Sequence, residues 1–355
     1  MVDVFSKRLL SLVVGFALAL YLGACGGKHD PEEPEQPDPE VTDTFVKGVD
    51  VSWVTEMESK GYKFYNSKGE ARECTALLNE LGANAVRLRV WVNPTDGWNG
   101  RDDVVVKAKR AQALGMKVLV DFHYSDTWAD PGHQTVPAAW KGKDAAAMAA
   151  AVKAHTQDVL QALKSAGVDV AWVQVGNEVT GGMLWNTGKV SGSSVGQFVS
   201  YFHAGREAVK AVYPDAKVVL HIDNGWKMET LNWFLTLMQT HLLQYDILGL
   251  SLYPSYWENG AYPDWTPKVK QFVSNVPVLV KNYGKPVMLV EFGMPASQPD
   301  KAAAALRYII DQTKNNDSFL GVFYWEPEAE HDRCGYDYGA FSGGKPTSAL
   351  DPFKD

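Results

Sequence analysis

The sequence predicts an α/β protein built as a single (β/α)8 TIM barrel, and three observations lead to this fold class. Short β-rich runs alternate with longer amphipathic stretches from residue 45 onward. The β-rich runs are nearly continuous apolar segments, as expected for parallel strands that are covered on both faces. No glycine-rich phosphate loop follows the first run, although a doubly wound sheet, the rival fold, would normally carry one there. Eight strand–helix units therefore favour the barrel.

The expected elements follow one another in a regular order. Strands are expected at 46–52, 85–91, 117–123, 170–177, 217–223, 246–253, 286–292 and 319–325. Helices are expected at 71–82, 103–115, 144–167, 195–213, 229–242, 266–283 and 300–315. Several of these helical stretches end at a glycine, which commonly terminates a helix because it adopts a left-handed backbone without strain.

Residues 1–24 are interpreted as a lipoprotein signal peptide rather than as part of the fold. Lys7 and Arg8 precede an apolar run from Leu9 to Leu22, which is too short for a membrane span. Small residues then precede Cys25, as in the lipobox of bacterial lipoproteins, so Cys25 is expected to carry the lipid. A plain secretory peptide with an incidental cysteine is the alternative.

Residues 25–44 are expected to form an acidic, proline-rich tether that joins the lipidated cysteine to a domain at 45–355. Proline and like charges extend a chain and cannot pack a core. An acidic stretch directly after a lipidated cysteine resembles the surface-export signals of some Gram-negative bacteria. The expected location is therefore the outer membrane, facing the cell surface.

The charge of the chain is concentrated in that tether. The net charge of the whole chain is -8, and residues 28–43 contain seven acidic residues and one lysine. The remaining domain is therefore near neutral, which argues against a nucleic-acid partner and suits an uncharged substrate.

Polar and aromatic side chains gather at the C-terminal ends of all eight expected strands. In a barrel, these ends and the loops that follow them build the active site. One polar strand end is usually a cap or an ion pair, but eight of eight are hard to explain by packing. The group consists of Asp50, Trp53, Arg87, Arg89, Trp91, Asp121, His123, Asp126, Asn177, Glu178, His221, Asp223, Asn224, Tyr253, Glu291, Trp325 and Glu326.

Glu178 and Glu291 are the candidate catalytic groups. Each ends an apolar run, on the fourth and the seventh expected strand, where burial can tune the pKa of a carboxyl. Taken singly, each would more often be structural. As a pair at one barrel mouth, they match the two carboxylates that glycoside hydrolysis needs. Ten of the twelve tryptophans also lie at or just after strand ends, where their flat rings suit sugar faces, although several could simply pack the loops.

Four longer motifs carry a resemblance to a known family. They are GVDVS at 48–52, VRLRVWVNP at 86–94, DFHYSDTWADP at 121–131 and VGNEVTGGMLW at 175–185. Together with Glu291, these motifs resemble glycoside hydrolase family 53, which belongs to clan A of the retaining glycosidases. That family comprises endo-β-1,4-galactanases, which act on the galactan side chains of pectin (type I arabinogalactan).

The resemblance implies a double-displacement mechanism that requires no cofactor or metal. Glu178 is expected to be the acid/base and Glu291 the nucleophile. Asn177 is expected to hold the sugar 2-hydroxyl, and Trp325 to form the floor under that sugar. The expected substrate contacts are Arg87, Trp91, His123, Ser125, Asp126, Asn177, His221, Asp223, Asn224, Tyr253 and Trp325.

The sequence also departs from the family pattern. The nucleophile segment reads EFGMP at 291–295 and the loop after it is short. Some bacterial members bind a structural calcium between the loops after strands seven and eight. The loop after strand eight contains several acidic residues here, but without a calcium-loop spacing a solvated loop is favoured over a calcium site.

Three questions stay open at this level. Another clan A activity, a mannanase or a xylanase, is the first alternative function, and a non-catalytic glycan-binding surface lipoprotein is the second. The domain is expected to be a monomer. Cys74 and Cys334 could meet in a disulfide at the barrel mouth, although two free thiols are slightly favoured.

Overall fold

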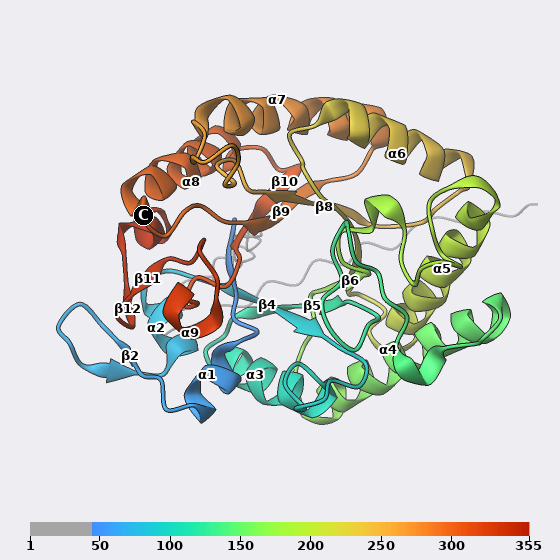
Figure 1. Ribbon diagram of the computed structural model, residues 1–355, viewed down its shortest axis with the longest axis horizontal. Coiled ribbons are helices and arrows are strands. Elements are labelled where there is room, and N and C mark those ends of the chain that lie inside the picture. The colour runs from blue at the N-terminus through green and yellow to red at the C-terminus, as the bar shows by residue number, and fades with distance from the viewer. Residues whose placement is uncertain (1–44, 355) are drawn as a thin grey trace, which may run out of the picture. The chain divides into compact units, whose positions relative to one another are not determined.

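The structure of the protein, a computed structural model, describes residues 45–354. The expected signal peptide, the lipidated Cys25 and the tether therefore lie outside the described residues. Eight parallel strands close into a barrel in the order β1-β10-β9-β8-β7-β6-β5-β4, which confirms the predicted (β/α)8 fold (Figure 1). The barrel strands are β1 Val46–Asp50, β4 Ala85–Val90, β5 Lys117–Phe122, β6 Trp172–Val175, β7 Lys217–Ile222, β8 Ile247–Leu252, β9 Val287–Phe292 and β10 Phe319–Tyr324.

Helices surround this barrel (Figure 1), and their bounds agree with the expected ones except at the first helix. The main helices are α2 Cys74–Glu80, α3 Arg101–Ala113, α4 Ala145–Ser165, α5 Val195–Val212, α6 Met228–Thr240, α7 Thr266–Tyr283 and α8 Pro299–Thr313. Two short helices, α1 Val54–Ser59 and α9 His331–Cys334, lie in the loops after β1 and β10. A 3-10 helix at Ser348–Phe353 takes the place of an eighth main helix and packs against α8.

The expected helix at 71–82 is wrong in its first turn. Ala71–Arg72 forms a short strand, β3, which pairs with β2 at Phe64–Tyr65. The helix begins at Cys74 because the Glu73 side chain caps it, accepting a hydrogen bond of 2.7 Å from the backbone N–H of Ala76. A second two-stranded hairpin joins β11 Phe341–Ser342 to β12 Lys345–Pro346.

Two separate apolar clusters hold the barrel together. The larger one fills the space between the sheet and the helices. The smaller one takes residues from each of the eight strands and so fills one end of the barrel interior. Position 48, beside this layer, has to be glycine, because a Cβ there would lie 2.2 Å from the Phe323 ring. The smaller cluster consists of Val46, Ala85, Leu119, Trp172, Val219, Ile247, Met288, Val290 and Phe323.

The inward positions change from apolar to polar toward the C-terminal ends of the strands. Side chains alternate along a strand, so the residue two places after an inward apolar residue also points inward. In this way Arg87 follows Ala85, Asp121 follows Leu119, and His221 follows Val219. A layer of buried polar groups therefore lies directly above the apolar floor of the barrel.

Strand β9 departs from this alternation just before Glu291. Leu250 of β8 pairs with Leu289, but the next residue, Ser251, pairs with Glu291, so β9 contains one extra residue at this point. Such a bulge re-aims the side chain that follows it. As a result Val290 and Glu291 both point into the barrel, although they are neighbours in sequence.

Two further features bear on the open questions. Cys74 and Cys334 are both free thiols, so the alternative of a disulfide between them is not realised. Within residues 45–354, no helix is both long and apolar enough to cross a membrane.

Candidate active site

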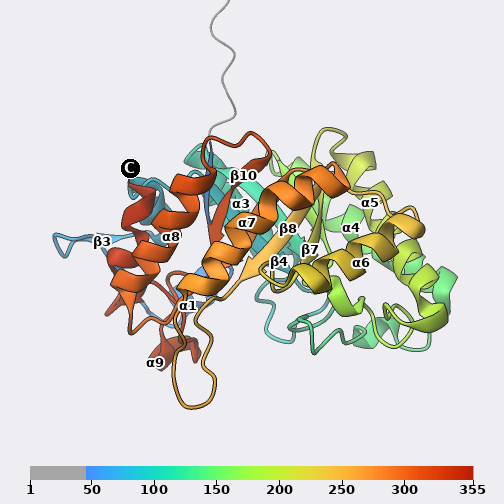
Figure 2. The same ribbon diagram turned by 90° about the horizontal axis from the view of Figure 1, so that it is seen from above.

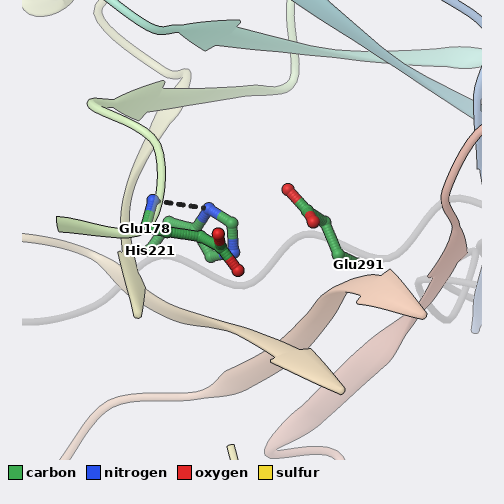
Figure 3. Close-up of side chains that lie close together, drawn as sticks. All are labelled: Glu178, His221 and Glu291. Carbon is green, nitrogen blue, oxygen red and sulfur yellow. Dashed lines mark hydrogen bonds between the residues drawn. The ribbon is translucent and has the colours of Figure 1, made fainter. Parts of the chain in front are cut away.

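Glu178 and Glu291 face each other across the mouth of the barrel (Figure 3). Glu178 lies just after β6 and Glu291 lies on β9. An oxygen of one carboxyl lies within 4.8 Å of an oxygen of the other. Retaining glycosidases hold their two carboxyl groups about 5–5.5 Å apart, whereas inverting enzymes leave about 6.5–9.5 Å for a water molecule. This close approach agrees with a retaining pair and leaves less room than an inverting pair needs.

The carboxyl of Glu291 is held from both sides. Its Oε1 accepts a hydrogen bond of 2.8 Å from Nη2 of Arg87, and its Oε2 accepts one of 2.9 Å from the Tyr253 hydroxyl. The side chain is only 5% exposed. Both oxygens are thus fixed in direction, which prepares one of them to reach a sugar carbon in the space toward Glu178.

Arg87 is the centre of a buried polar network. Its guanidinium has five N–H groups in a rigid plane, and it uses them to join four strands and the loop after β6. All of these contacts lie between 2.6 and 2.9 Å. The partners are Gln174, Asp50, Asp121, Asn177 and Glu291.

His221 supports Glu178 from below. The backbone N–H of Glu178 donates to Nδ1 of His221 at 3.2 Å, so Nδ1 is the acceptor, and Nε2 can donate to Ser251 Oγ at 2.7 Å. Burial and the charge of Arg87 lower the pKa of His221 well below its usual range, so the ring is neutral. Although Glu178, His221 and Glu291 could together surround a metal ion, both nitrogens of His221 are already engaged within the protein.

The backbone conformation of Glu178 is unusual for a residue other than glycine. Its φ of 47° lies in the left-handed region, which costs free energy for any residue but glycine. Tyr124, Asn224 and Glu326 adopt the same conformation just after β5, β7 and β10. Backbone strain is therefore concentrated at the strand ends that form this mouth.

The environments of the two carboxyls set the order in which they lose protons. Burial, together with the charges of Glu291 and Asp223, raises the pKa of Glu178 well above its usual range. Burial also raises the pKa of Glu291, to about 7, but Arg87 and the Tyr253 hydroxyl oppose that rise. Glu291 therefore ionises first and Glu178 keeps its proton, as an acid and a nucleophile require.

We expect a bell-shaped pH profile for kcat/KM, with its acid limb set by Glu291 and its alkaline limb by Glu178. Because the pKa of Glu291 is raised from 4.5, activity should rise with pH at values above the ordinary carboxyl range. Tyr253→Phe removes a donor to the charged form, so the acid limb should move to higher pH by about one unit or more. Kinetics across the pH range measure this shift.

Tyr213→Phe is the matched control for that shift. Its hydroxyl is also engaged, at 2.7 Å from the backbone oxygen of Val168, but it lies at the opposite end of the barrel. The control should leave the profile unchanged. An acid limb at the same pH in Tyr253→Phe and in the wild type would contradict the contact with Glu291.

Aromatic rings form one wall of the mouth around Arg89. The guanidinium of Arg89 lies 4.2 Å from the ring centre of Trp128, 5.0 Å from that of Trp53 and 5.3 Å from that of Trp91. Its Nη1 is paired with the buried carboxyl of Glu326. Trp325 packs edge-on against Trp53, with the ring centres 5.6 Å apart. This packing fixes the orientation of the rings that a sugar would meet.

The structure gives several expected substrate contacts another role. Arg87, His123, Ser125 and His221 are buried, so they offer little surface to a sugar. His123 accepts from the backbone N–H of Ala129 at 3.0 Å and pairs with Asp121 at 3.0 Å. Their hydrogen bonds orient the residues around them, and the expectation that these four also touch the substrate stays a prediction.

Asp126 is also occupied by the protein. Its two oxygens accept the backbone N–H groups of Asn93 and Ala138, at 3.0 and 2.7 Å, so this carboxylate ties the loop after β4 to the loop after β5. The candidates that keep partly exposed surface at the mouth are Trp91, Asp126, Asp223, Asn224, Tyr253 and Trp325. Asn177 is nearly buried, but its Nδ2 group has a second hydrogen besides the one donated to the Ala129 oxygen.

Two members of the network were not identified as site residues from the sequence. Gln174 bridges Arg87 and Asp121, and its Nε2 lies 3.0 Å from Nδ1 of His221. Ser251 accepts the hydrogen bond from His221. Each is a polar residue in the middle of an otherwise apolar strand, which is the signal that could have identified it.

An eight-stranded barrel with facing carboxylates after its fourth strand and on its seventh defines a glycoside hydrolase of the retaining type. The comparison with known families agrees, since residues 46–350 match the description Glycosyl hydrolase family 53. The chain belongs to this family.

Named relatives extend over most of the chain. An arabinogalactan endo-β-1,4-galactanase from Humicola insolens is 34% identical over 308 residues, which cover 80% of this chain and 90% of the relative. An endo-β-1,4-galactanase from Bacillus subtilis (strain 168) is 33% identical over 314 residues, covering 80% of this chain and 70% of the relative. A solved structure from work on two fungal β-1,4-galactanases superposes with a TM-score of 0.77 at 32% identity, covering 86% of this chain and 98% of that one.

Proposed function

We propose that this protein is a retaining endo-β-1,4-galactanase that cleaves the galactan chains of type I arabinogalactan. The observation that carries the reaction type is the pair of facing carboxyls, Glu178 and Glu291, within 4.8 Å of each other. The substrate is supported by the galactanase relatives over 80% of the chain. A near-neutral domain with an aromatic wall suits an uncharged glycan.

The first step of the reaction forms a bond between Glu291 and the sugar. The ionised carboxylate attacks the anomeric carbon while Glu178 gives its proton to the leaving glycosidic oxygen. The second oxygen of Glu291 keeps its hydrogen bond to Tyr253 or Arg87, so the attacking carboxylate keeps its orientation. Asn177, beside Glu291 on the Arg87 guanidinium, is placed to hold the 2-hydroxyl of the same sugar.

The second step releases the sugar with its original configuration. Glu178, now ionised, removes a proton from a water molecule, and that water attacks the anomeric carbon and displaces Glu291. Two inversions at one carbon give net retention. The neutral His221 below the Glu178 backbone adds no charge that would perturb this proton transfer.

The experiment that tests this function follows the products of β-1,4-galactan. We expect the new reducing ends to appear first as the β-anomer by proton NMR, and the viscosity to fall early, as internal cleavage requires. Mannan and xylan under the same conditions test the alternative activities. An α-anomer as first product would contradict retention, and cleavage of mannan or xylan in preference to galactan would contradict the substrate.

The proposal extends to the location of the enzyme. The signal-like residues 1–24, the small residues before Cys25 and the acidic tether support an exported lipoprotein, held by lipid at the outer membrane and facing the cell surface. The tether would let a monomeric catalytic domain reach galactan outside the cell.

The proposed enzyme requires no calcium. Two acidic side chains of the loop after β10, Glu330 and Asp337, are engaged by the protein itself, which supports this part of the proposal. Glu330 accepts the backbone N–H groups of Gly343 and Gly344 at 2.8 Å each, and Asp337 lies 2.8 Å from His331.

A further inference from the structure

The loop between β8 and α7 carries the most exposed aromatic residues near the barrel mouth. Tyr256 is 57% exposed and Trp257 is 52% exposed. The loop spans residues 253–265 and projects from the end of the barrel that carries α1 and α9 (Figure 2). Single exposed aromatic residues are common on protein surfaces, but a contiguous exposed pair such as Tyr256 and Trp257 is a candidate contact surface for a ligand.

The loop holds its shape through contacts of its own. Glu258 and Ala261 exchange two backbone hydrogen bonds of 3.0 Å, and Ser255 Oγ donates to the backbone oxygen of Pro263 at 2.6 Å. The Trp257 ring packs edge-on against Tyr262, with the ring centres 4.8 Å apart. A preformed aromatic surface binds a flat ligand face with little loss of conformational entropy.

Ring contacts connect the exposed pair to the nucleophile. Tyr256 stacks on Tyr338 with ring centres 5.1 Å apart and planes 4° apart. Tyr338 in turn packs against Tyr253 at 6.2 Å, and the Tyr253 hydroxyl bonds Glu291. The backbone N–H of Trp257 also donates to the Tyr338 hydroxyl at 3.0 Å. The exposed rings are therefore continuous with the catalytic centre, and two ring-to-ring steps separate Tyr256 from the residue that holds the nucleophile.

The negative charge of the loop favours a neutral glycan over an acidic one. Glu258 and Asp264 are exposed, and residues 253–265 contain no lysine or arginine. A chain of acidic sugars would be repelled by these carboxylates. A neutral galactan chain would present CH-rich sugar faces to the rings without that repulsion.

The geometry points to a distal sugar-binding platform, made by Tyr256 and Trp257, that holds a part of a neutral galactan chain away from the cleavage point. This inference rests on the proposed galactanase function and adds where a long chain is held. The platform contacts sugars that do not react, so it contributes equally to ground-state and transition-state binding. Such uniform binding lowers KM without changing kcat.

The test compares Trp257→Ala with Trp233→Ala. Trp233 is the matched control because it is the same residue, is 51% exposed and lies on α6 in the outer ring of helices (Figure 1). For long galactan, Trp257→Ala should raise KM by about tenfold, the loss expected for one good aromatic contact, with kcat unchanged. For the shortest galacto-oligosaccharide that is cleaved, KM should not change, and Trp257→Phe should restore most of the binding to the polymer.

A binding assay separates this inference from the proposed function. In the Glu291→Gln background, which removes the nucleophile, migration through a native gel containing β-1,4-galactan reports binding without hydrolysis. We expect retardation in galactan, less retardation after Trp257→Ala, and none in polygalacturonate. Equal retardation with and without Trp257, no retardation in galactan at all, or stronger retardation in polygalacturonate would each overturn the platform. A wild-type protein that cleaves no galactan, although its Glu291→Gln variant binds galactan through Trp257, would overturn only the proposed function.

Discussion

Glu291→Gln should abolish hydrolysis of galactan, with kcat lower by on the order of 10⁴- to 10⁶-fold, as in other enzymes that lose their nucleophile. The amide is close in size to the carboxyl and can still accept a hydrogen bond from Arg87 or Tyr253. It has no negative charge to attack the anomeric carbon, so the covalent intermediate cannot form. Stopped assays at high enzyme concentration, with freshly purified protein, measure the residual rate.

Glu178→Gln provides the comparison that separates the two roles. A substrate with a good leaving group, such as a nitrophenyl glycoside of a galacto-oligosaccharide, departs without a proton. Loss of the acid should then slow formation of the glycosyl-enzyme far less for this substrate than for galactan. Glu291→Gln should be equally inactive on both. If Glu178→Gln and Glu291→Gln lost the same activity on the activated substrate, the assignment of acid and nucleophile would be wrong.

The barrel and its catalytic pair could be predicted because they depend on local patterns. Parallel strands covered on both faces produce apolar runs, and the polar residue that ends such a run must lie at the C-terminal face of a barrel. The same reasoning places Glu178 and Glu291 at one mouth of the barrel. The sequence did not reveal the bulge on β9, since nothing in VMLVEF distinguishes a regular strand from one in which Val290 and Glu291 both point inward.

The division between sugar contacts and supporting residues could not be predicted either. Arg87 lies within β4, whereas His123, Asp126 and Asn224 follow strands, and sequence position alone gives all four the same expected role. Burial and hydrogen-bond partners distinguish them, since Arg87 is fully buried, whereas Asp126 and Asn224 are both partly exposed and the oxygens of Asp126 accept backbone N–H groups. These contacts join loops that are far apart in the chain, so no local pattern encodes them.

The network around Arg87 makes the second strong prediction. Arg87→Lys keeps the positive charge but replaces a planar fork of five N–H groups with a single ammonium group. One ammonium cannot reach Asp50, Asp121 and Glu291 at the same time, since the guanidinium uses separate nitrogens for Asp50 and Glu291. We expect kcat/KM to fall by about 10²- to 10³-fold, the range for losing one preorganised donor in an active site.

The acid limb of the pH profile should move upward in the same variant. Arg87 lowers the pKa of Glu291 against the effect of burial, so a weaker contact leaves Glu291 protonated to higher pH. Arg101→Lys is the control, because the Arg101 guanidinium is exposed and its partners, Asp102 and Asp158, lie outside the barrel mouth. Unchanged kcat/KM in Arg87→Lys would contradict the need for a planar cation at this position.

Arg87→Met should lose stability as well as activity. It fills a similar volume but leaves Asp50, Asp121 and Glu291 buried without their cation. Removing one partner from a buried ion pair costs about 3–5 kcal/mol, because the remaining charge is no longer compensated. Urea denaturation should therefore show a lower free energy of unfolding for Arg87→Met than for Arg87→Lys. If both variants unfolded like the wild type, the carboxylates would have to be neutral in the folded protein, and Glu291 could not be the ionised nucleophile that the mechanism requires.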